Sequence, residues 1–327
     1  MPWRGAEYPG EFPTLGWEVG EWIESHCVIP DREHGGEPYK LTDEMWAFLA
    51  HHYRLTDSAR VGQLATAFSH RRSILVRPQK WGKGPLTAAL ICAEAIGPTV
   101  FDGFDAAGEP VGKPRPTPRI QIAATTDDQV MTNVYGHLVP MIQRGPLYDL
   151  IPDAGLTRVL LPGGGSIEPV TSKATSRLGA PISFAVMDET GIWTKENKGH
   201  DLAKTLRRGL AGMGGRSVET TNAWNPAELS TAQMGFESKA LDIYRDYLRP
   251  PVHLSYGNKA ERRRIHKHVY GDSWWVDLDG IEAEAAEILE TDPANAERFF
   301  GNRVVAGSDT WLPRGLWDTA YADALAA

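Results

Sequence analysis

The chain has 327 residues, of which 42% are hydrophobic and 23% charged, and its formal net charge is −8 at pH 7. This composition is ordinary for a globular protein, and the length suits one large or two ordinary domains. The charge argues against a globally basic nucleic-acid binder but leaves room for a local basic track. No apolar run reaches the roughly 18 residues of a membrane span, and no signal peptide is predicted. Two cysteines, Cys27 and Cys92, are too few for a disulfide framework or a zinc site, so we expect a reducing, cytoplasmic setting.

The order of predicted elements indicates an α/β fold. The first 40 residues are rich in Gly, Pro and Trp and predict irregular structure, after which 41–55 predicts a helix with Thr42 as its N-cap. Apolar strands are predicted at 73–77, 119–124, 182–187, 217–221 and 252–256. Helices are predicted at 85–96, 126–143, 200–211 and 229–248. Strand–helix alternation with apolar strands predicts a mostly parallel sheet covered by helices on both faces.

Two segments interrupt this alternation. The Gly/Pro-rich stretch 97–118 predicts a surface loop, and 157–171 predicts a hairpin across a Gly turn. Beyond about residue 270 the chain becomes helical and acidic, and its last residues resemble a linker.

The stretch ILVRPQKWGKGPLT at 74–87 has the outline of a phosphate-binding loop. Such a loop binds phosphates through successive backbone N–H groups and the positive end of the following helix, and its Lys, here Lys83, neutralises the β- and γ-phosphates. The usual pattern G-x-x-x-x-G-K-[ST] is broken twice, because Arg77 replaces the first Gly and Gly84 replaces the Ser or Thr. Taken alone, the Gly-Lys pair also fits an ordinary strand-to-helix turn.

A second polar strand end is FAVMDET at 184–190, where an apolar strand runs into Asp188 and Glu189. In phosphate-loop ATPases such an Asp anchors Mg²⁺ and the adjacent Glu polarises the attacking water. Ligands of parallel sheets bind at the carboxyl ends of the strands. We therefore expect Lys83 and Asp188 on neighbouring strands at that edge, although two acids can also simply begin a loop.

The third polar strand end is VETTNAWNP at 218–226, which carries Thr220, Thr221 and Asn222. At the same sheet edge these side chains could contact a γ-phosphate or its water. The alternative is a strand end capped by turn residues.

In this order, the three segments resemble the ATPase domain of large terminase subunits, the DNA-packaging motors of tailed bacteriophages. The likeness spans roughly residues 38–318. It includes IQIAATTDDQV at 120–130, GSIEPVTSKATSRLGAPISFAVMDE at 165–189, and FFGNRVVAGSDTWLPRGLWD at 299–318. No single segment is highly specific, but their joint order is.

The resemblance implies a P-loop NTPase fold of the ASCE type with a small lid subdomain. Residues 1–60 would form an N-terminal segment and adenine-side region, and 61–257 the ATPase core. Residues 258–327 would form a helical lid and linker that leads to a nuclease domain, which we expect this chain to lack.

The resemblance also implies ATP and Mg²⁺ as cofactors and assigns roles to residues. Asp188 would hold Mg²⁺, Glu189 would be catalytic, and Arg177 would be an arginine finger offered to a neighbouring subunit's ATP or, alternatively, a surface arginine. The residues implied to contact ATP are Arg77, Gln79, Lys80, Trp81, Gly82, Lys83 and Gly84. The residues implied to couple hydrolysis to movement are Thr220, Thr221 and Asn222. Arg77 could reach phosphate or pair with a nearby acid.

The departures from the loop pattern predict weaker nucleotide or Mg²⁺ binding than in a standard site. Gly84 supplies no hydroxyl to Mg²⁺, and Thr87, about one helical turn on, is not expected to replace it. Pro85 has no N–H to offer a phosphate, although a proline is tolerated in the first turn of a helix. Trp81 could partly compensate by shielding the loop from water.

Basic segments at 206–216 and 261–270 are candidates for contact with the DNA backbone. We favour Arg207, Arg208 and Arg216, because they lie between the acidic strand end and the coupling segment. For the second segment, the alternative is a solvated helical face. Four acids of the C-terminal region also predict a solvated face rather than a metal cluster, so we expect no DNA cleavage; they are Glu282, Glu284, Glu287 and Glu290.

The family implies double-stranded DNA, the portal protein of the procapsid and a small terminase subunit as partners, and the host cytoplasm as the location. It implies a homo-oligomeric ring when active and allows a monomer when the chain is isolated. Two other functions stay open. One is a helicase-like or other DNA-dependent ATPase, and the other is a nucleotide-binding or scaffold protein that lost catalysis through Gly84 and Pro85.

Overall fold

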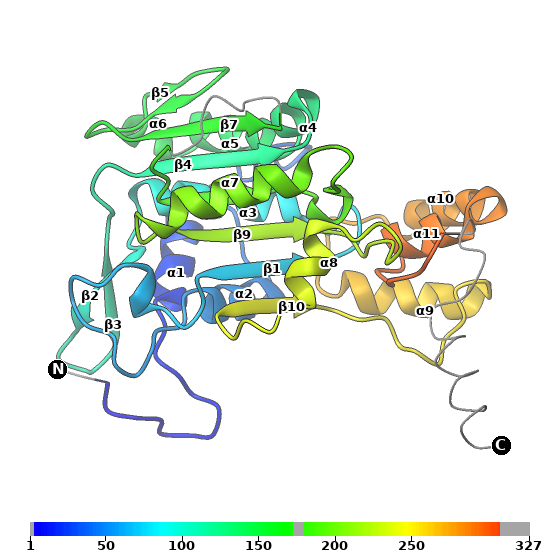
Figure 1. The fold of residues 1–327 in the computed structure, drawn as a ribbon, viewed down its shortest axis with the longest axis horizontal. Helices are drawn as coiled ribbons and strands as arrows, with labels where there is room; N and C mark the ends of the chain where they lie inside the picture. The colour runs from blue at the N-terminus through cyan, green and yellow to red at the C-terminus, as the bar shows by residue number, and fades with distance from the viewer. Residues whose placement is uncertain (1–2, 173–179, 308–327) are drawn as a thin grey trace.

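An eight-stranded sheet runs through the computed structural model, which describes residues 3–172 and 180–307 (Figure 1). The strand order is β10-β1-β9-β8-β4-β7-β6-β5. The parallel strands are β1 (Arg72–Val76), β4 (Arg119–Ala124), β7 (Ser166–Thr171), β8 (Phe184–Met187), β9 (Arg216–Thr221) and β10 (Ile243–Tyr247). The short edge strands β5 (Asp153–Ala154) and β6 (Val159–Leu160) are antiparallel. The predicted α/β class with a mostly parallel sheet is confirmed.

The central strands are buried along their whole length, as a sheet covered on both faces requires. The register pairs Val76 of β1 with Thr221 of β9, and Met187 of β8 with Glu219 of β9. The carboxyl ends of these three strands therefore lie at one edge. One detail of the prediction is wrong: β9 lies between β1 and β8, so the strands that precede Lys83 and Asp188 are not neighbours.

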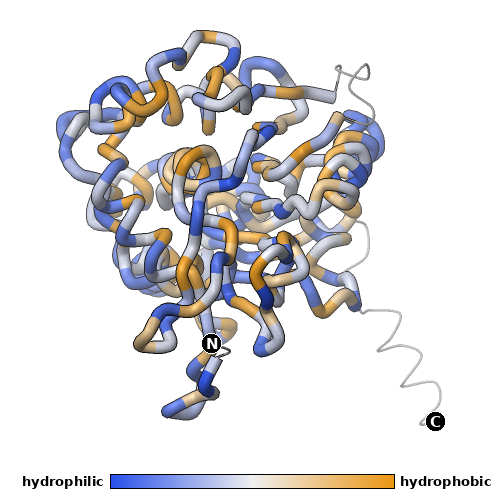
Figure 2. Tube along the Cα trace, turned by 90° about the vertical axis from the view of Figure 1, so that its left-hand side faces the viewer, coloured by the Kyte–Doolittle hydropathy of each residue, from blue (hydrophilic) through white to orange (hydrophobic). Residues whose placement is uncertain are grey.

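Helices cover both faces of the sheet. The main core packs the sheet against α1 (Gly16–His26), α2 (Asp43–His52), α3 (Lys83–Ile96) and α5 (Val134–Gln143). On the other face, α7 (Gly199–Ala211) packs against β8, and α8 (Thr231–Phe236) packs beside β1 (Figure 1). In the view turned by 90°, apolar segments gather inside and hydrophilic segments lie mostly around the rim (Figure 2). Within the described ranges, no helix is both long and apolar enough to cross a membrane.

A small helical unit stands beyond the carboxyl ends of the strands (Figure 1). It consists of α9 (Lys259–Tyr270), α10 (Leu278–Thr291) and α11 (Pro293–Phe299), which share an apolar cluster of their own. We call this unit, residues 259–299, the C-terminal helical unit. Its place at the ligand-binding edge of the sheet brings it next to the loop between β1 and α3.

The N-terminal region contains a helix that the sequence did not predict. In α1, a Cβ on Gly16 would lie 2.5 Å from Cα of Ala50, and one on Gly20 would lie 1.9 Å from the Trp46 ring. Both glycines let α1 approach α2 closely. Glycine has a low helix propensity, which is why the glycines of this segment predict a loop in the sequence. In the fold the same glycines allow two helices to pack closely.

Four other segments differ from their predicted form. The segment 97–118 contains a hairpin of β2 (Val100–Phe104) and β3 (Pro110–Lys113), and 126–143 is split at Asn133 into α4 (Asp127–Thr132) and α5. The predicted helix 229–248 contains only the short α8 and then strand β10, while 252–256 is a turn. β10 is a strand because it pairs with β1 at the sheet edge, a long-range contact that outweighs local propensity.

Two charged residues of the C-terminal helical unit are buried against the expectation of a solvated face. Arg262 donates from Nη2 to Oε1 of Glu282 at 2.7 Å and from Nε to Oε2 at 3.2 Å. Both side chains are about 95% buried. This bidentate pair holds α9 to α10, so neither Arg262 nor Glu282 is available at the surface.

Arg262→Ala is expected to lower the free energy of unfolding by about 3–5 kcal/mol, because it leaves the Glu282 carboxylate buried without its partner. Arg263→Ala is the control, since Arg263 and Asp279 form an exposed pair whose loss should cost about 1 kcal/mol or less. Urea unfolding followed by circular dichroism measures both. Equal losses in the two variants would contradict a structural role for the buried pair.

Candidate active site

The loop from Arg77 to Gly82 joins β1 to α3 and lies against the C-terminal helical unit. The backbone N–H of Gln79 donates to Phe299 O at 2.8 Å, Tyr270 Oη donates to Gln79 O at 2.8 Å, and Ser273 Oγ donates to Trp81 O at 3.2 Å. Gly82 has a φ of +110°, and a Cβ there would lie 2.8 Å from the Trp275 ring. A glycine is therefore required where α3 begins.

Lys83 is buried at the N-terminus of α3 with its ammonium group fully hydrogen-bonded. Nζ donates to Arg77 O and Pro78 O at 3.0 Å each and to Asn222 Oδ1 at 2.6 Å. Glu189 Oε1 lies 3.8 Å away. Burial lowers the pKa of Lys83, while Glu189 and Asp188 act in the opposite direction. An ammonium group has three N–H donors, so an incoming phosphate would replace one of these partners.

Asp188 follows β8 and is held by two hydrogen bonds to its carboxylate. Thr220 Oγ1 donates to Oδ1 at 2.7 Å, and Asn133 Nδ2 donates to Oδ2 at 3.0 Å. Trp193 Nε1 donates to the backbone O of Asp188 at 2.9 Å. These bonds fix the direction of a buried carboxylate, which is the ligand type that Mg²⁺ prefers.

Glu189 has a left-handed backbone conformation, with a φ of +56°, and a side chain that is about one-quarter exposed. Asn222 Nδ2 donates to its Oε2 at 3.3 Å. Burial raises the pKa of Glu189, Lys83 lowers it, and Asp188 raises it further. A non-glycine residue in this backbone region stores strain that is common at functional sites.

The end of β9 connects these groups. Thr220 binds Asp188, Thr221 Oγ1 accepts from Gly191 N at 2.9 Å, and Asn222 bridges Lys83 and Glu189. The structure thus brings together the three polar strand ends that the sequence singled out.

A cavity of about 430 Å³ opens in front of these groups. Its walls come from Gly82–Gly84 and Asp188–Glu189, from Asn133 and His137, from most of residues 29–40, and from Trp274 and Trp275. A helix N-terminus, a buried lysine and fixed carboxylates around one cavity fit a nucleoside polyphosphate with a divalent cation. Within the part of the chain that the structure describes, no group of three or more His, Cys, Asp or Glu side chains is placed to hold a metal ion.

Comparison with known proteins gives phage relatives. No family model matches the chain. The chain is 27% identical over 359 residues to the "Gene 13 protein" of Mycobacterium phage D29, covering 95% of the chain and 58% of that protein. It is 28% identical over 363 residues to the "Gene 13 protein" of Mycobacterium phage L5, covering 95% and 59%. The chain therefore spans less than two-thirds of the length of these relatives.

Among solved structures, the HK97 bacteriophage large terminase matches with a TM-score of 0.66 at 18% identity, over 93% of this chain and 58% of that chain. This chain has the fold of a phage large terminase. The fold predicted from the order of the strand-end motifs is confirmed.

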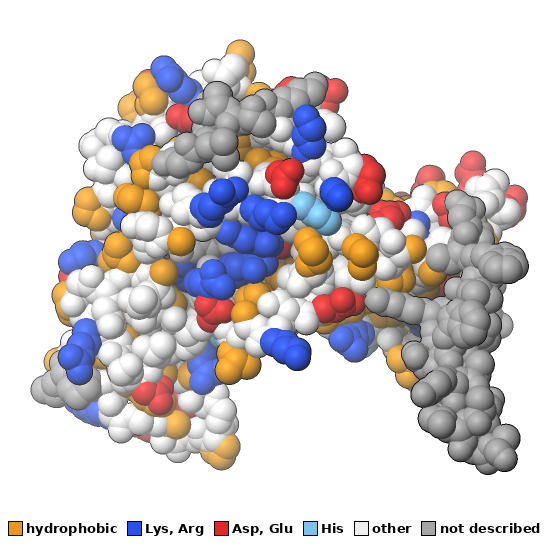
Figure 3. All heavy atoms as spheres, viewed as in Figure 1, with side chains coloured by type: hydrophobic (Ala, Val, Ile, Leu, Met, Phe, Trp, Pro, Cys, Tyr) orange, Lys and Arg blue, Asp and Glu red, His pale blue; other side chains and the backbone are white. Residues whose placement is uncertain are grey.

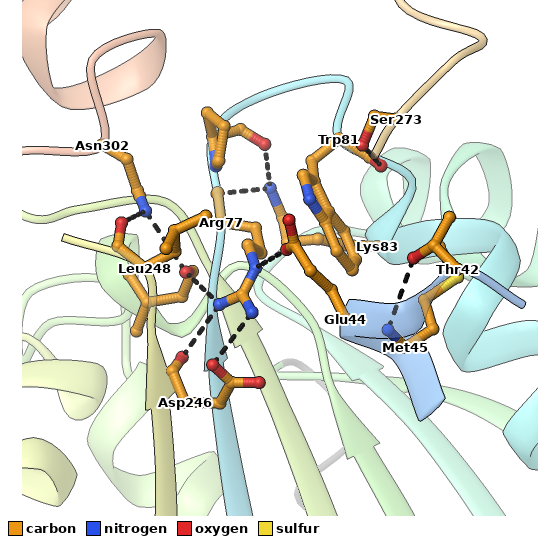
Figure 4. Close-up of polar contacts among 12 residues, drawn as sticks. Thr42, Glu44, Met45, Arg77, Trp81, Lys83, Asp246, Leu248, Ser273 and Asn302 are labelled. Carbon is orange, nitrogen blue, oxygen red and sulfur yellow. Dashed lines mark hydrogen bonds and ion pairs between the residues drawn. The ribbon is translucent and has the colours of Figure 1, made fainter. Parts of the chain in front are cut away.

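Arg77 does not line the cavity of this terminase fold. Its guanidinium donates to Glu44 at 3.2 Å and to Asp246 at 2.9 Å, and it lies 5.1 Å from the centre of the Trp81 ring (Figure 4). The alternative of pairing with nearby acids is therefore what the structure shows. Trp81 is 1% exposed inside the main core and does not line the cavity. That it shields the loop from water stays a prediction.

Thr87 does not replace the missing hydroxyl, as expected. Its Oγ1 lies 2.9 Å from the carbonyl oxygens of both Lys83 and Gly84, which share its single proton, and its side chain is buried. The space beside Gly84 is filled instead by His137, since a Cβ on Gly84 would lie 2.6 Å from Cδ2 of that imidazole.

Sequence reasoning missed the residues that close the cavity from distant segments. Asn133 lies at the break just before α5 and His137 in the first turn of α5, and Arg32 Nη1 donates to Trp275 O at 3.1 Å. None belongs to a short motif with the loop. The local signal was a polar residue, His137, within a mostly apolar helix.

The three predicted DNA contacts have different surroundings. Arg216 is 5% exposed, with its guanidinium 4.0 Å from the centre of the Phe68 ring and hydrogen-bonded to the backbone carbonyls of His52 and His70. A buried guanidinium cannot contact DNA, so this assignment is wrong. Arg207 is half-buried and donates to Glu219 at 2.9 Å, whereas Arg208 is exposed.

Arg177, the predicted arginine finger, lies outside the described residues.

Lys and Arg side chains gather on one face over α7 and β9 (Figure 3). α7 carries the exposed Lys204 and Arg208 and the half-buried Arg207. Contacts with DNA phosphates need mainly positive charge. This face has that charge even without Arg216, so it meets the electrostatic requirement for binding a DNA backbone.

Arg216→Ala should lower the free energy of unfolding by roughly 2–4 kcal/mol, because it removes a buried stacking and hydrogen-bonding group. Arg208→Ala, on the exposed face of α7, should leave unfolding nearly unchanged. Thermal and urea unfolding of both variants provide the measurement. A stable Arg216→Ala protein would show that the buried guanidinium is dispensable to the fold.

Proposed function

We propose that this chain is the ATP-hydrolysing part of a large terminase subunit, and that hydrolysis drives double-stranded DNA into a procapsid. The observation that carries the proposal is the network of Lys83, Asn222, Glu189 and Asp188 at the carboxyl edge of the sheet. These are the groups that phosphoryl transfer to water needs: a cation for the phosphates, a carboxylate for a metal and a second carboxylate for the water.

In this proposal, the N–H groups at the start of α3 and the ammonium of Lys83 bind the phosphates. Lys83 would exchange its bond to Asn222 or to a loop carbonyl for a phosphate oxygen. Asp188 would hold Mg²⁺, with Thr220 and Asn133 fixing the carboxylate. A bound Mg²⁺ supplies charge stabilisation at the β- and γ-phosphates.

Glu189 would orient the attacking water and accept its proton. Its raised pKa makes it a better base than an exposed glutamate, while ionisation stays accessible because Lys83 lies 3.8 Å away. Asn222 contacts both Lys83 and Glu189. If phosphate binding broke the bond between Asn222 and Lys83, the side chain of Asn222 at the end of β9 would lose a partner and could move. This supports a coupling role for Thr220, Thr221 and Asn222.

For DNA, we propose a contact through the exposed cations of α7, in particular Arg208, with Arg207 partly neutralised by Glu219. The portal protein, the small terminase subunit, a ring of subunits with Arg177 as its arginine finger, and a host-cytoplasmic location rest on the resemblance to the family. A nucleotide-binding protein without catalysis is the alternative, and Glu189 argues against it.

Glu189→Gln should retain nucleotide binding but lose about 10²–10⁴-fold in turnover, because an amide cannot accept the proton. Lys83→Ala should weaken nucleotide binding itself. Glu196→Gln, an exposed glutamate seven residues along, is the matched control and should behave as wild type. Phosphate release and calorimetry with ATP, with and without double-stranded DNA, measure turnover and affinity.

Two outcomes of this experiment would contradict the proposal. Wild-type turnover by Glu189→Gln would remove the catalytic role of that residue. ATP binding without hydrolysis by the wild-type protein, even with DNA and procapsids present, would favour the binding-only alternative.

The rate of hydrolysis should fall as pH decreases through the pKa of Glu189, because the protonated carboxyl cannot act as a base. Burial raises that pKa above its ordinary value of 4.5, so the acid limb should lie above pH 4.5. A pH–rate profile at saturating ATP, with the fold checked at each pH by circular dichroism, measures it. An acid limb at or below pH 4.5 would argue against Glu189 as the base.

A further inference from the structure

The imidazole of His137 occupies the position from which a phosphate loop usually presents its hydroxyl. A Cβ on Gly84 would lie 2.6 Å from Cδ2 and 2.9 Å from Nε2 of His137. Both distances are shorter than real Cβ contacts. A Ser or Thr at position 84 and this imidazole therefore cannot both keep these positions: with a side chain at residue 84 the ring has to turn away, and Gly84 is the residue that leaves the observed ring position free.

The residue just before α5 is a partner of Asp188. Asn133, one helical turn before His137, donates to Oδ2 of Asp188 at 3.0 Å, and the N–H of His137 donates to Asn133 O at 3.2 Å. Both side chains line the cavity together with Lys83 and Asp188. The start of α5 thus brings an amide to Asp188 and an imidazole to the loop at Gly84.

A carboxylate lies behind the ring. Oδ2 of Asp31 is 3.7 Å from Nδ1 of His137, on the opposite side of the imidazole from Gly84. In metal sites, a carboxylate in this position favours the tautomer with the proton on Nδ1, which leaves the lone pair of Nε2 free. The free nitrogen is then the one beside the phosphate loop.

We propose that Nε2 of His137 replaces the missing loop hydroxyl as a ligand of the divalent cation that accompanies the nucleotide. Asp31 orients the ring, and Asp188 serves the same cation from the other side. This inference rests on the proposed nucleotide binding. Phosphate oxygens and water would complete the coordination.

A nitrogen ligand changes which cation the site prefers. Mg²⁺ favours oxygen ligands, whereas imidazole favours later first-row metals such as Co²⁺. The site is therefore expected to bind nucleotide with Co²⁺ more tightly, relative to Mg²⁺, than a site with a hydroxyl does. The two positions should also compensate for each other. Removing the imidazole of His137 makes room for a serine at position 84, whose hydroxyl could then take the place of the ring nitrogen.

The test compares wild type, Gly84→Ser, His137→Ala and the double variant Gly84→Ser/His137→Ala. Calorimetry gives the Kd of ADP with excess Mg²⁺ and with excess Co²⁺, and the visible spectrum of bound Co²⁺ reports its ligands. The ratio of the Mg²⁺ to the Co²⁺ Kd should fall about 10-fold in His137→Ala. The double variant should share this low ratio and bind ADP–Mg²⁺ at least as tightly as wild type, whereas Gly84→Ser alone should bind weakly with either metal.

Two further variants separate ligation from folding. His137→Asn keeps a donor toward Asp31 but removes the ring nitrogen beside Gly84, so it should match His137→Ala in metal ratio. Asp31→Asn should lower the ratio less than removal of the ring does. Unfolding midpoints within a few degrees of wild type show that each variant is folded.

The outcomes distinguish this inference from the proposed function. If wild type binds ADP but neither His137 variant changes the metal ratio or the Co²⁺ spectrum, His137 is not a ligand, and the proposed ATPase is untouched. If Gly84→Ser alone binds as tightly as the double variant, the two positions do not exclude each other. If no variant binds ADP with either metal, both the inference and the nucleotide site are overturned.

Discussion

The amide of Asn222 is the interaction on which the site depends. It accepts from the buried Lys83 ammonium and donates to the partly buried Glu189 carboxylate, so one neutral side chain contacts two charges of opposite sign. An unpaired buried charge is costly, and neither charge makes a hydrogen-bonded contact with the other, since they lie 3.8 Å apart. The end of the central strand β9 therefore stabilises the charged groups of the site in addition to its role in the sheet.

The second constraint is the contact between the phosphate loop and the C-terminal helical unit. Main-chain groups of Gln79 and Trp81 bond to Phe299, Tyr270 and Ser273, and the Trp275 ring lies where a Cβ on Gly82 would be. The loop thus takes its shape from both the sheet and this unit. A change in the loop on phosphate binding would be transmitted to the unit through hydrogen bonds rather than through a flexible linker.

Buried arginines account for most of the differences between predicted and observed roles. Three guanidinium groups donate hydrogen bonds inside the protein rather than at its surface: those of Arg77, Arg216 and Arg262. Their acceptors are carboxylates or backbone carbonyls of other segments. A guanidinium has five N–H donors in a rigid plane, so it can serve as an internal connector as well as a surface cation. The sequence records the charge of such a residue but carries no sign of the carbonyls that will surround it.

The sequence by itself determined the sheet class, the order of the three polar strand ends, and the meeting of Lys83, Asp188 and the end of β9 at one edge. It could do so because apolar strands, their following helices and the acids at their ends are local patterns, and parallel strands share a ligand-binding edge. Only the tertiary structure decided that β9 separates the other two strands, that 243–247 is a strand, and that His137 fills the space beside Gly84. Each of these depends on contacts between segments more than 50 residues apart, which no local pattern encodes.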